Sequence, residues 1–288
     1  MVILEQLANG LSLGALYALV AAGLAMIFGV LEIVNFAHGE FLMIASYLFF
    51  SLYTIAKFAY PLAALFTAAL MALFGALFEL LVIRPVVHRP WQTQLVATLG
   101  ASVLLINAAI LLFGTFPKRA PTPLAAQLLV LGTVSVSYQR ILLLVVTLGA
   151  FVLLHLFVHG TKLGKAMRAV SQNREACVAV GIDAQRVAIV TFALGSALVG
   201  LGAGLNAALG NITPTMGILL TIKAFAVVIM GGFGRVNGAI VSAFILGTAE
   251  AFIVQYFSSA YVDAFSFLVM LGVLLLRPQG LFGRRVGI

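Results

Sequence analysis

Apolar runs long enough to cross a membrane repeat along nearly the whole chain of 288 residues. A transmembrane helix needs roughly 20 predominantly apolar residues, and on this rule the sequence predicts nine spans. The break between the first two spans, residues 31–37, is short, so these two can instead form one span followed by a broken or re-entrant helix. The predicted spans are residues 3–30, 38–55, 61–83, 93–114, 141–159, 187–209, 216–232, 239–257 and 261–276.

The composition excludes a soluble domain. Hydrophobic residues make up 63% of the chain, charged residues 8%, and the mean hydropathy is +1.19. A water-soluble fold of this length cannot bury so much apolar surface. A transmembrane β-barrel would show short alternating segments instead of continuous apolar runs. We therefore expect an all-α, polytopic integral membrane helix bundle of about eight to nine spans, formed by residues 1–288 as a single domain.

The basic residues between the spans predict the orientation of the bundle. Loops facing the cytoplasm carry an excess of Lys and Arg. One predicted face has eleven such residues and the other has four, which predicts a cytoplasmic C-terminus and an external N-terminus. Because the net charge of +8 resides mostly in these loops, it does not indicate nucleic-acid binding. The eleven are Arg84, Arg89, Lys162, Lys165, Arg168, Arg174, Arg186, Arg235, Arg277, Arg284 and Arg285, and the four are Lys57, Lys118, Arg119 and Arg140.

The longest charged polar segment, residues 160–186, lies between two apolar runs. Within it, the sequence SQNREACVAVG predicts one short helix. Ser171 or Asn173 can serve as its N-cap, Glu175 suits the positive helix start, and Gly181 can end it. A capped helix exposed to the cytoplasm suggests a docking site for a soluble partner. The alternative is an ordinary connecting loop that contains a helical turn.

A second polar segment, NFAHGE at residues 35–40, separates the first two apolar runs. Asn and Gly suit a non-helical backbone. A helix break at membrane depth is tolerated where it lines a cavity, and the exposed helix ends can bind polar solutes. The alternative is a plain cytoplasmic turn. His38 and Glu40 are two positions apart, which is a poor spacing for metal ligands on one helix face, so we expect no metal site. The candidate pathway residues are Asn35, Phe36, His38, Gly39 and Glu40.

Two charged residues lie well inside predicted spans: Lys223 and Glu250. Charges at such positions usually face the protein interior and find partners, so we predict a structural pair in preference to a proton relay. The alternative is that Lys223 extends to the headgroups and Glu250 is neutral and hydrogen-bonded.

Small residues recur every fourth position in two predicted spans. Ser196, Gly200, Gly204 and Ala208 form one such series, and Gly10 and Gly14 form another. Small faces let helix backbones approach closely in lipid, so this pattern predicts helix packing.

No constellation of residues indicates an enzyme or a bound cofactor. The GxSxG match at residues 10–14 falls inside an apolar helix, where a nucleophile elbow cannot form. HExxH, CxxC and the phosphate-binding pattern GxxxxGK[ST] do not occur in the sequence. The glycine-rich stretch at residues 231–238 predicts a tight turn between two spans.

Four stretches of the sequence resemble one known family over nearly the whole chain. They are ALYALVAAGLAMIFGVLEIVNFAHGEFLM, NREACVAVGI, IKAFAVVIMGGFGRVNGAIVSAFILGTAE and LLLRPQGLFG, in this order. Together they resemble the branched-chain amino acid ABC transporter permeases, in particular the smaller permease subunit of the high-affinity leucine, isoleucine and valine import systems.

The resemblance implies a permease subunit of a bacterial or archaeal inner-membrane importer that works by alternating access. It implies four kinds of partner: a second related permease or a second copy, two cytoplasmic ATPases that hydrolyse the ATP, an extracytoplasmic solute-binding protein, and the lipid bilayer. Permeases that look like this also serve urea, short amides and aromatic acids, and a secondary transporter without ATPases is a further alternative. The resemblance implies an ATPase-coupling role for Asn173, Arg174, Glu175, Ala176 and Gly181.

Overall fold

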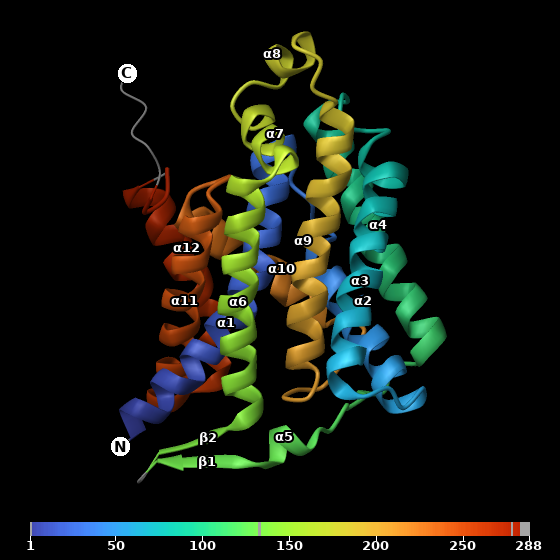
Figure 1. Cartoon of the computed structure of the whole chain (residues 1–288). Coiled ribbons are helices and arrows are strands. Elements are labelled where there is room, and N and C mark those ends of the chain that lie inside the picture. The colour runs from blue at the N-terminus through green and yellow to red at the C-terminus, as the bar shows by residue number, and fades with distance from the viewer. Residues whose placement is uncertain (1, 132–133, 278, 283–288) are drawn as a thin grey trace.

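The computed structural model describes residues 2–131, 134–277 and 279–282, and it shows a bundle of helices that run up and down between two ends (Figure 1). Seven helices are long and apolar enough to cross a membrane, and they correspond to seven of the nine predicted spans. These helical segments are Ile3–Leu31, Tyr60–Ile83, Trp91–Phe113, Tyr138–Gly160, Ala184–Asn206, Val236–Tyr256 and Ser259–Leu276.

The described part of the chain contains twelve α-helices and three short helical segments of other types. The α-helices are α1 (Val2–Leu31), α2 (His38–Phe50), α3 (Tyr60–Phe78), α4 (Trp91–Phe113), α5 (Pro123–Ala126), α6 (Tyr138–Gly160), α7 (Lys162–Val170), α8 (Arg174–Ala179), α9 (Ala184–Asn206), α10 (Met216–Gly231), α11 (Val236–Tyr256) and α12 (Val262–Leu276). The π-helical segments η1 (Ser51–Ile55) and η2 (Glu79–Ile83) extend α2 and α3, and the 3₁₀ turn η3 (Ser259–Tyr261) precedes α12.

Two of the predicted spans, residues 38–55 and 216–232, do not form full-length transmembrane helices. α2 (13 residues) continues into η1 (5 residues), which gives 18 helical residues, and α10 has 16, whereas roughly 20 are needed to cross the hydrocarbon core. The sequence of α10 is as apolar as those of the seven candidate spans, so hydropathy could not distinguish it, whereas the α2 run opens with the polar residues His38 and Glu40. The difference lies in where each helix begins.

α2 begins inside the bundle, about halfway along α1. The imidazole Nε2 of His38 lies 3.1 Å from the backbone oxygen of Val20, eleven residues before the end of α1 at Leu31. At 1.5 Å per residue, His38 lies about 16 Å along α1 from its end. The six residues 32–37 are not helical, and an extended chain of that length can cover ~20 Å. The second reading of the first two apolar runs, one span followed by a broken helix, is therefore correct.

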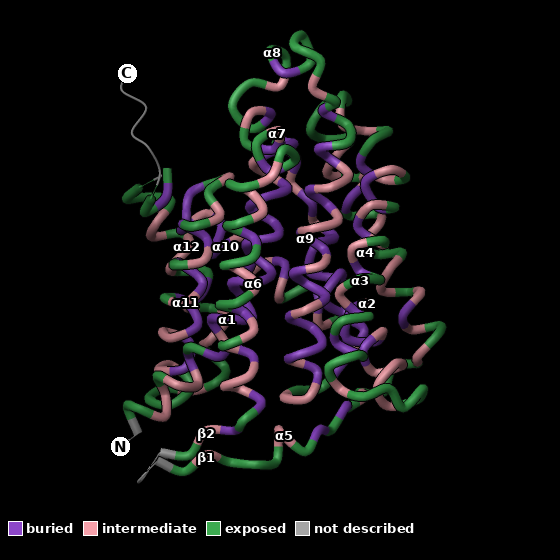
Figure 2. Tube along the Cα trace, in the orientation of Figure 1, coloured by how far each residue is buried: buried purple, intermediate pink, exposed green. Residues whose placement is uncertain are grey.

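The centre of the bundle is formed by α1 and α9. In the most apolar stretch of α1, 83% of the residues are buried, against 11% in α6 and in α12 (Figure 2). The small residues lie where helices cross, as predicted: Gly14 of α1 faces α11, and Gly75 of α3 faces Ser196 of α9. A side chain at either glycine would overlap the backbone of its neighbour. The outer faces of α4, α6 and α12 are left to lipid or to other proteins.

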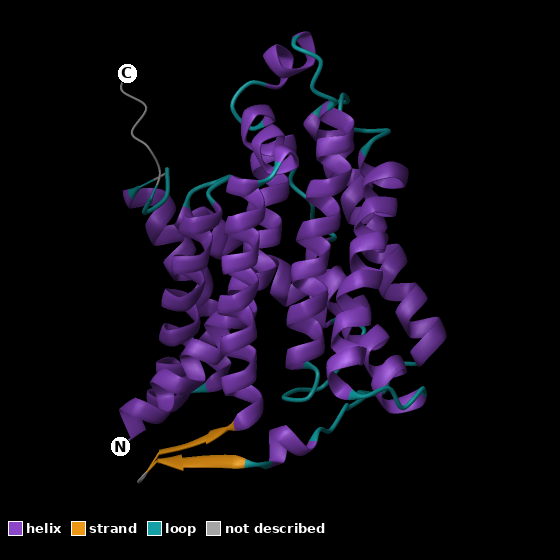
Figure 3. Ribbon diagram, viewed as in Figure 1, coloured by secondary structure: helices purple, strands orange, loops and turns teal. Residues whose placement is uncertain are grey.

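The connection at residues 115–139 contains a short β-hairpin that the sequence analysis did not predict (Figure 3). After a largely extended stretch and α5, β1 (Leu128–Leu131) pairs antiparallel with β2 (Val134–Ser137). Such short strands are specified by their pairing with each other more than by their own residues. The fold is therefore an α-helical bundle with one small hairpin at its rim.

The basic residues separate to the two ends of the bundle. At the end that carries α8, Arg84 donates to the side chain of Gln185 at 2.5 Å. At the opposite end, Arg119 donates to Asn211 at 2.7 Å. The separation matches the two groups counted from the sequence, except that Arg284 and Arg285 lie outside the described residues. We refer below to the first end as the α8 end.

Candidate functional site

The polar segment between α1 and α2 is enclosed by the bundle. Asn35 and His38 are fully buried, and Glu40 is 1% exposed. The side-chain oxygen of Asn35 accepts from the backbone N–H of Ala37 at 3.0 Å, a local bond that replaces the missing helical one. The ring of Phe36 lies 5.2 Å from that of Phe225 in α10. The segment is thus an ordered part of the core and not a turn in water.

Two interrupted helices begin against one another at this segment. The backbone N–H of Gly39 in α2 donates to the Thr221 hydroxyl in α10 at 3.0 Å, and that hydroxyl donates in turn to the oxygen of Gly217. A side chain on Gly217 would overlap the carboxylate of Glu40. The first turns of α2 and α10 therefore meet at the Glu40 carboxylate, where the positive ends of the two helix dipoles favour negative charge.

Glu40 also reaches a third helix. Its Oε1 accepts a hydrogen bond from the Ser102 hydroxyl of α4 at 2.9 Å. The sequence analysis missed Ser102, Gly217 and Thr221, since single small polar residues within apolar helices are common. The one sequence signal was a glycine, Gly217, at the start of an apolar run of only 16 residues, which is compatible with close packing at a helix start.

Three buried polar atoms of this segment have no hydrogen-bond partner among the described residues: Asn35 Nδ2, His38 Nδ1 and Glu40 Oε2. An unsatisfied buried polar atom costs roughly 1–3 kcal/mol, so a concentration of them within six residues requires an explanation. One explanation is that these atoms form hydrogen bonds with a solute or with water when one is bound. We call Asn35, Phe36, His38, Gly39 and Glu40 the break segment.

A second polar cluster joins four helices around Lys223. Its Nζ lies 3.1 Å from Oε2 of Glu250 and 3.1 Å from Oδ1 of Asp263. Tyr17 of α1 donates to the same Glu250 oxygen at 2.7 Å. The ammonium group therefore points to carboxylates, not to the headgroups as in the alternative reading.

Asp263 and Ser266 are members of this cluster that the sequence analysis did not identify. Ser266 donates to the other oxygen of Glu250, which is thereby bonded on both sides. Asp263 is 47% exposed in its side chain, whereas Glu250 is 1% exposed. Asp263 lies in the first turn of α12, where an acidic residue is common in any helix, so the sequence does not indicate a partner. The packing of α12 on α10 brings it to Lys223.

The expected short helix at the α8 end is present and projects beyond the rest of the bundle (Figure 1). Asn173 is its N-cap and accepts from the N–H of Ala176 at 2.9 Å. Gly181 follows it with a φ of +84°, a left-handed conformation that glycine adopts without strain. Cys177 is buried and anchors the helix to the bundle.

The outer face of α8 is exposed and partly apolar. Val178 is 57% exposed and Val180 is 77% exposed, next to exposed Glu175 and Ala176. An exposed apolar face on a helix that extends outside the membrane bundle is typical of a protein contact. Among the described residues, no group of three or more His, Cys, Asp or Glu side chains could hold a metal ion.

The fold and the site define an integral membrane protein whose interrupted helices meet at a buried polar segment, the architecture of a transport permease. The family described as "Branched-chain amino acid transport system / permease component" matches residues 6–274. The chain belongs to this family.

Curated relatives match over nearly their whole length. The high-affinity branched-chain amino acid transport system permease protein BraD of Pseudomonas aeruginosa is 35% identical over 98% of this chain and 96% of its own. LivH of Escherichia coli K12, a permease protein with the same description, is 32% identical over the same shares. The probable LivH of the archaeon Methanocaldococcus jannaschii is 27% identical over 93% of this chain and 89% of its own.

A solved structure shares the fold at low sequence identity. PsaBC from Streptococcus pneumoniae in complex with Fab matches 94% of this chain and 91% of its own with a TM-score of 0.51 and 12% identity. This likeness concerns the fold alone; the family match and the curated relatives show that the chain is a transport permease component and not an enzyme.

Proposed function

We propose that the chain is the membrane-spanning permease subunit of an ABC importer that carries branched-chain amino acids across the cytoplasmic membrane of a bacterium or archaeon. The observation that carries this proposal is the end-to-end similarity to BraD and LivH, both named as branched-chain amino acid permease proteins. The other components would be a second permease or second copy, two ATPases on the cytoplasmic side, and an external solute-binding protein.

The break segment is the proposed substrate pathway. Its support is the burial of Asn35, His38 and Glu40 together with their three unpartnered polar atoms. The positive ends of two helices suit the carboxylate of an amino acid, and the Glu40 carboxylate suits its ammonium group. Because these groups are enclosed, a solute would reach them only after the helices move.

The helix α8 is the proposed coupling element. Its support is the exposed face of Val178 and Val180 and the anchoring through buried Cys177. A partner ATPase that moved α8 would act on α7 and α9, which flank it in the chain. Rigid helices would then transmit the motion to the break segment, as in alternating-access transporters.

The topology that accompanies this proposal places the α8 end in the cytoplasm. Its support is the excess of Lys and Arg in the loops at that end. The N-terminus would then lie outside, together with the β-hairpin.

A reconstituted transport assay tests the proposal. The chain is co-expressed with the ATPase, permease and binding-protein genes next to its own, and the complex is placed in liposomes with ATP inside. We expect ATP-dependent uptake of radiolabelled leucine, isoleucine or valine in the presence of the binding protein. Uptake of urea, a short amide or an aromatic acid in place of these would assign the alternative substrate. Uptake driven by an ion gradient without ATPases would contradict the ABC reading.

A further inference from the structure

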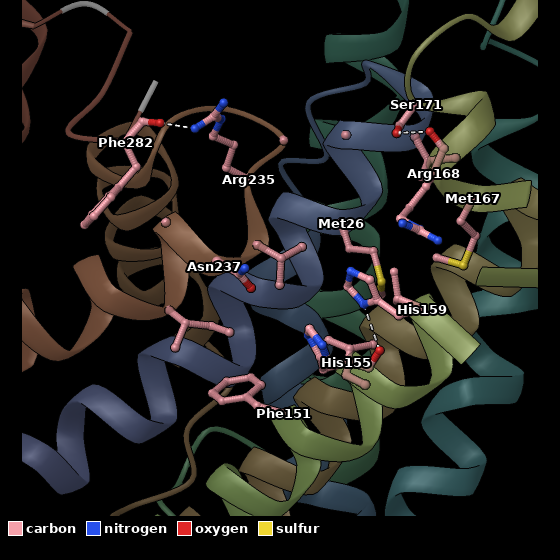
Figure 4. A pocket seen from close by; sticks show the side chains of 18 of the residues that line it. Met26, Phe151, His155, His159, Met167, Arg168, Ser171, Arg235, Asn237 and Phe282 are labelled. Atoms are coloured by element: carbon pink, nitrogen blue, oxygen red, sulfur yellow. Dashed lines mark hydrogen bonds between the residues drawn. The ribbon is translucent and has the colours of Figure 1, made fainter. Parts of the chain in front are cut away.

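A groove of about 490 Å³ opens at the α8 end between α1, α6, α7 and the start of α11 (Figure 4). Its floor is apolar and includes Met26, Leu154, Val158, Ile240 and Val241. It does not include any residue of the break segment or of the Lys223 cluster. The proposed function therefore leaves this groove without a role.

The rim of the groove is basic. It carries Arg168 from α7, Arg235 from the turn before α11, and His155 and His159 from α6, while no Asp or Glu lines it. All four side chains belong to exposed residues, and neither arginine forms an ion pair with any described acidic residue. A concave site lined by two guanidinium groups and no carboxylate attracts an anion.

The donors of the rim are partly fixed in place. His159 Nδ1 donates to the backbone oxygen of His155 at 2.9 Å, which fixes the orientation of the ring. The two imidazole rings stack with centroids 4.0 Å apart. Arg235 donates through Nη1 to the oxygen of Phe282, so part of its guanidinium remains available. Ser171 and Asn237 add neutral polar groups to the same rim (Figure 4).

The groove continues along α11 onto an exposed apolar surface. Val241 lines the groove and is 44% exposed, and it also lines an adjoining apolar pocket with Ile245, which is 47% exposed one turn further along α11. A ligand seated in the groove would thus have an anion-binding rim at one end and a lipid-exposed apolar helix beside it. Phospholipids have this combination of a phosphate headgroup and long acyl chains, whereas soluble anions do not.

We propose that this groove binds an anionic phospholipid, with the phosphate held by Arg168 and Arg235, and with the acyl chains along α11. The bound lipid would connect α7 to the start of α11. Since α7 leads directly into α8, occupancy of the groove would stabilise the position of the proposed coupling helix. The site itself depends only on the membrane location of the chain, not on its substrate.

Native mass spectrometry of the purified chain with phosphatidylglycerol tests the proposal. We expect retention of phosphatidylglycerol in preference to phosphatidylcholine, and a roughly tenfold or greater loss of affinity in the double variant Arg168→Gln, Arg235→Gln. The matched control is Lys165→Gln, which removes one positive charge from the exposed face of the same helix α7 but does not line the groove. Arg168→Lys, which keeps the charge, should retain most of the binding.

Three outcomes would overturn the proposal. Equal loss of lipid in Lys165→Gln and in Arg168→Gln would mean that general surface charge is responsible. Displacement of the lipid by inorganic phosphate or glycerol phosphate at similar concentrations would assign the groove to a soluble anion. A Val241→Cys variant that crosslinks to another protein chain in native membranes would mean that a protein, not lipid, fills the groove. Melting curves of each variant establish that it is folded before its lipid binding is compared.

Discussion

Gly39 and Thr221 join two helices that both begin inside the bundle. The N–H of Gly39 donates to the Thr221 hydroxyl at 3.0 Å, which brings the first turns of α2 and α10 together beside Glu40. Neither helix is among the seven segments long and apolar enough to cross a membrane. The bond therefore marks the point where the bundle is interrupted, and the predictions below begin there.

A methyl group at Gly217 should separate α2 from α10. Because it would overlap the Glu40 carboxylate, Gly217→Ala should lower the free energy of unfolding by roughly 1–3 kcal/mol and reduce uptake. Thermal melting of the detergent-solubilised protein measures the first effect. The control is Gly149→Ala in α6, where nothing lies within 4 Å of the added methyl group. Equal stability of both variants would contradict the close contact.

Removing the polar groups of the break segment should reduce transport but not insertion. His38→Leu and Glu40→Leu should each lower the uptake rate by about tenfold or more, while the amount of permease in the membrane is largely kept. The matched control is Asn107→Leu, which removes an exposed amide in α4 that bonds only to its own helix. Normal uptake in both break-segment variants would mean that the segment only connects α1 to α2 and does not contact the substrate.

The Lys223 cluster should show strong coupling between its members. Removing one partner of a buried ion pair leaves an uncompensated charge, at a cost of roughly 3–5 kcal/mol. Lys223→Met and Glu250→Gln should therefore each be destabilising, and the double variant should recover part of the loss. A double-mutant cycle on thermal stability measures the coupling.

Asp263 provides the internal comparison for this cycle. It lies as close to Lys223 as Glu250 does, at 3.1 Å, but its side chain is 47% exposed whereas that of Glu250 is 1% exposed. Asp263→Asn should therefore cost much less than Glu250→Gln. Strictly additive losses for Lys223 and Glu250 would mean that the two residues act independently.

Changes on the exposed face of α8 should uncouple ATP hydrolysis from uptake. Glu175→Arg and Ala176→Trp alter the exposed face without touching buried Cys177. We expect uptake to fall at least tenfold while the separate ATPase subunits retain basal hydrolysis. Arg89→Glu is the control, because it reverses one exposed charge at the same end of the bundle but outside α8. Full transport in the α8 variants would exclude this helix as the coupling element.

Cysteine labelling should distinguish the two sides of the membrane. The native Cys177 is buried and reports poorly, so the test uses Cys177→Ala with a new cysteine at Val180 or at Phe116, which are 77% and 79% exposed at opposite ends. A membrane-impermeant maleimide added to intact cells should label position 116 and not position 180. The reverse pattern would invert the proposed topology.

The sequence by itself determined the class of fold, the separation of basic residues to two ends, and α8 with its caps. These are local or compositional properties. A run of about 20 apolar residues specifies a helix in lipid whatever its neighbours are, because every backbone group must be bonded within the segment. Asn173 and Gly181 likewise act on backbone atoms only a few residues away.

Tertiary structure decided the features that depend on residues far apart in the chain. Hydropathy made α2 and α10 look like full spans, because burial in protein and burial in lipid select the same apolar residues. The depth at which His38 begins α2 is set by its contact with Val20, and the surroundings of Glu40 by Ser102 and Gly217. Lys223 and Glu250 could be paired from sequence because single charges in spans are expensive. Asp263, Ser266 and the basic groove could not, since they depend on how α12, α6 and α7 pack against the central helices.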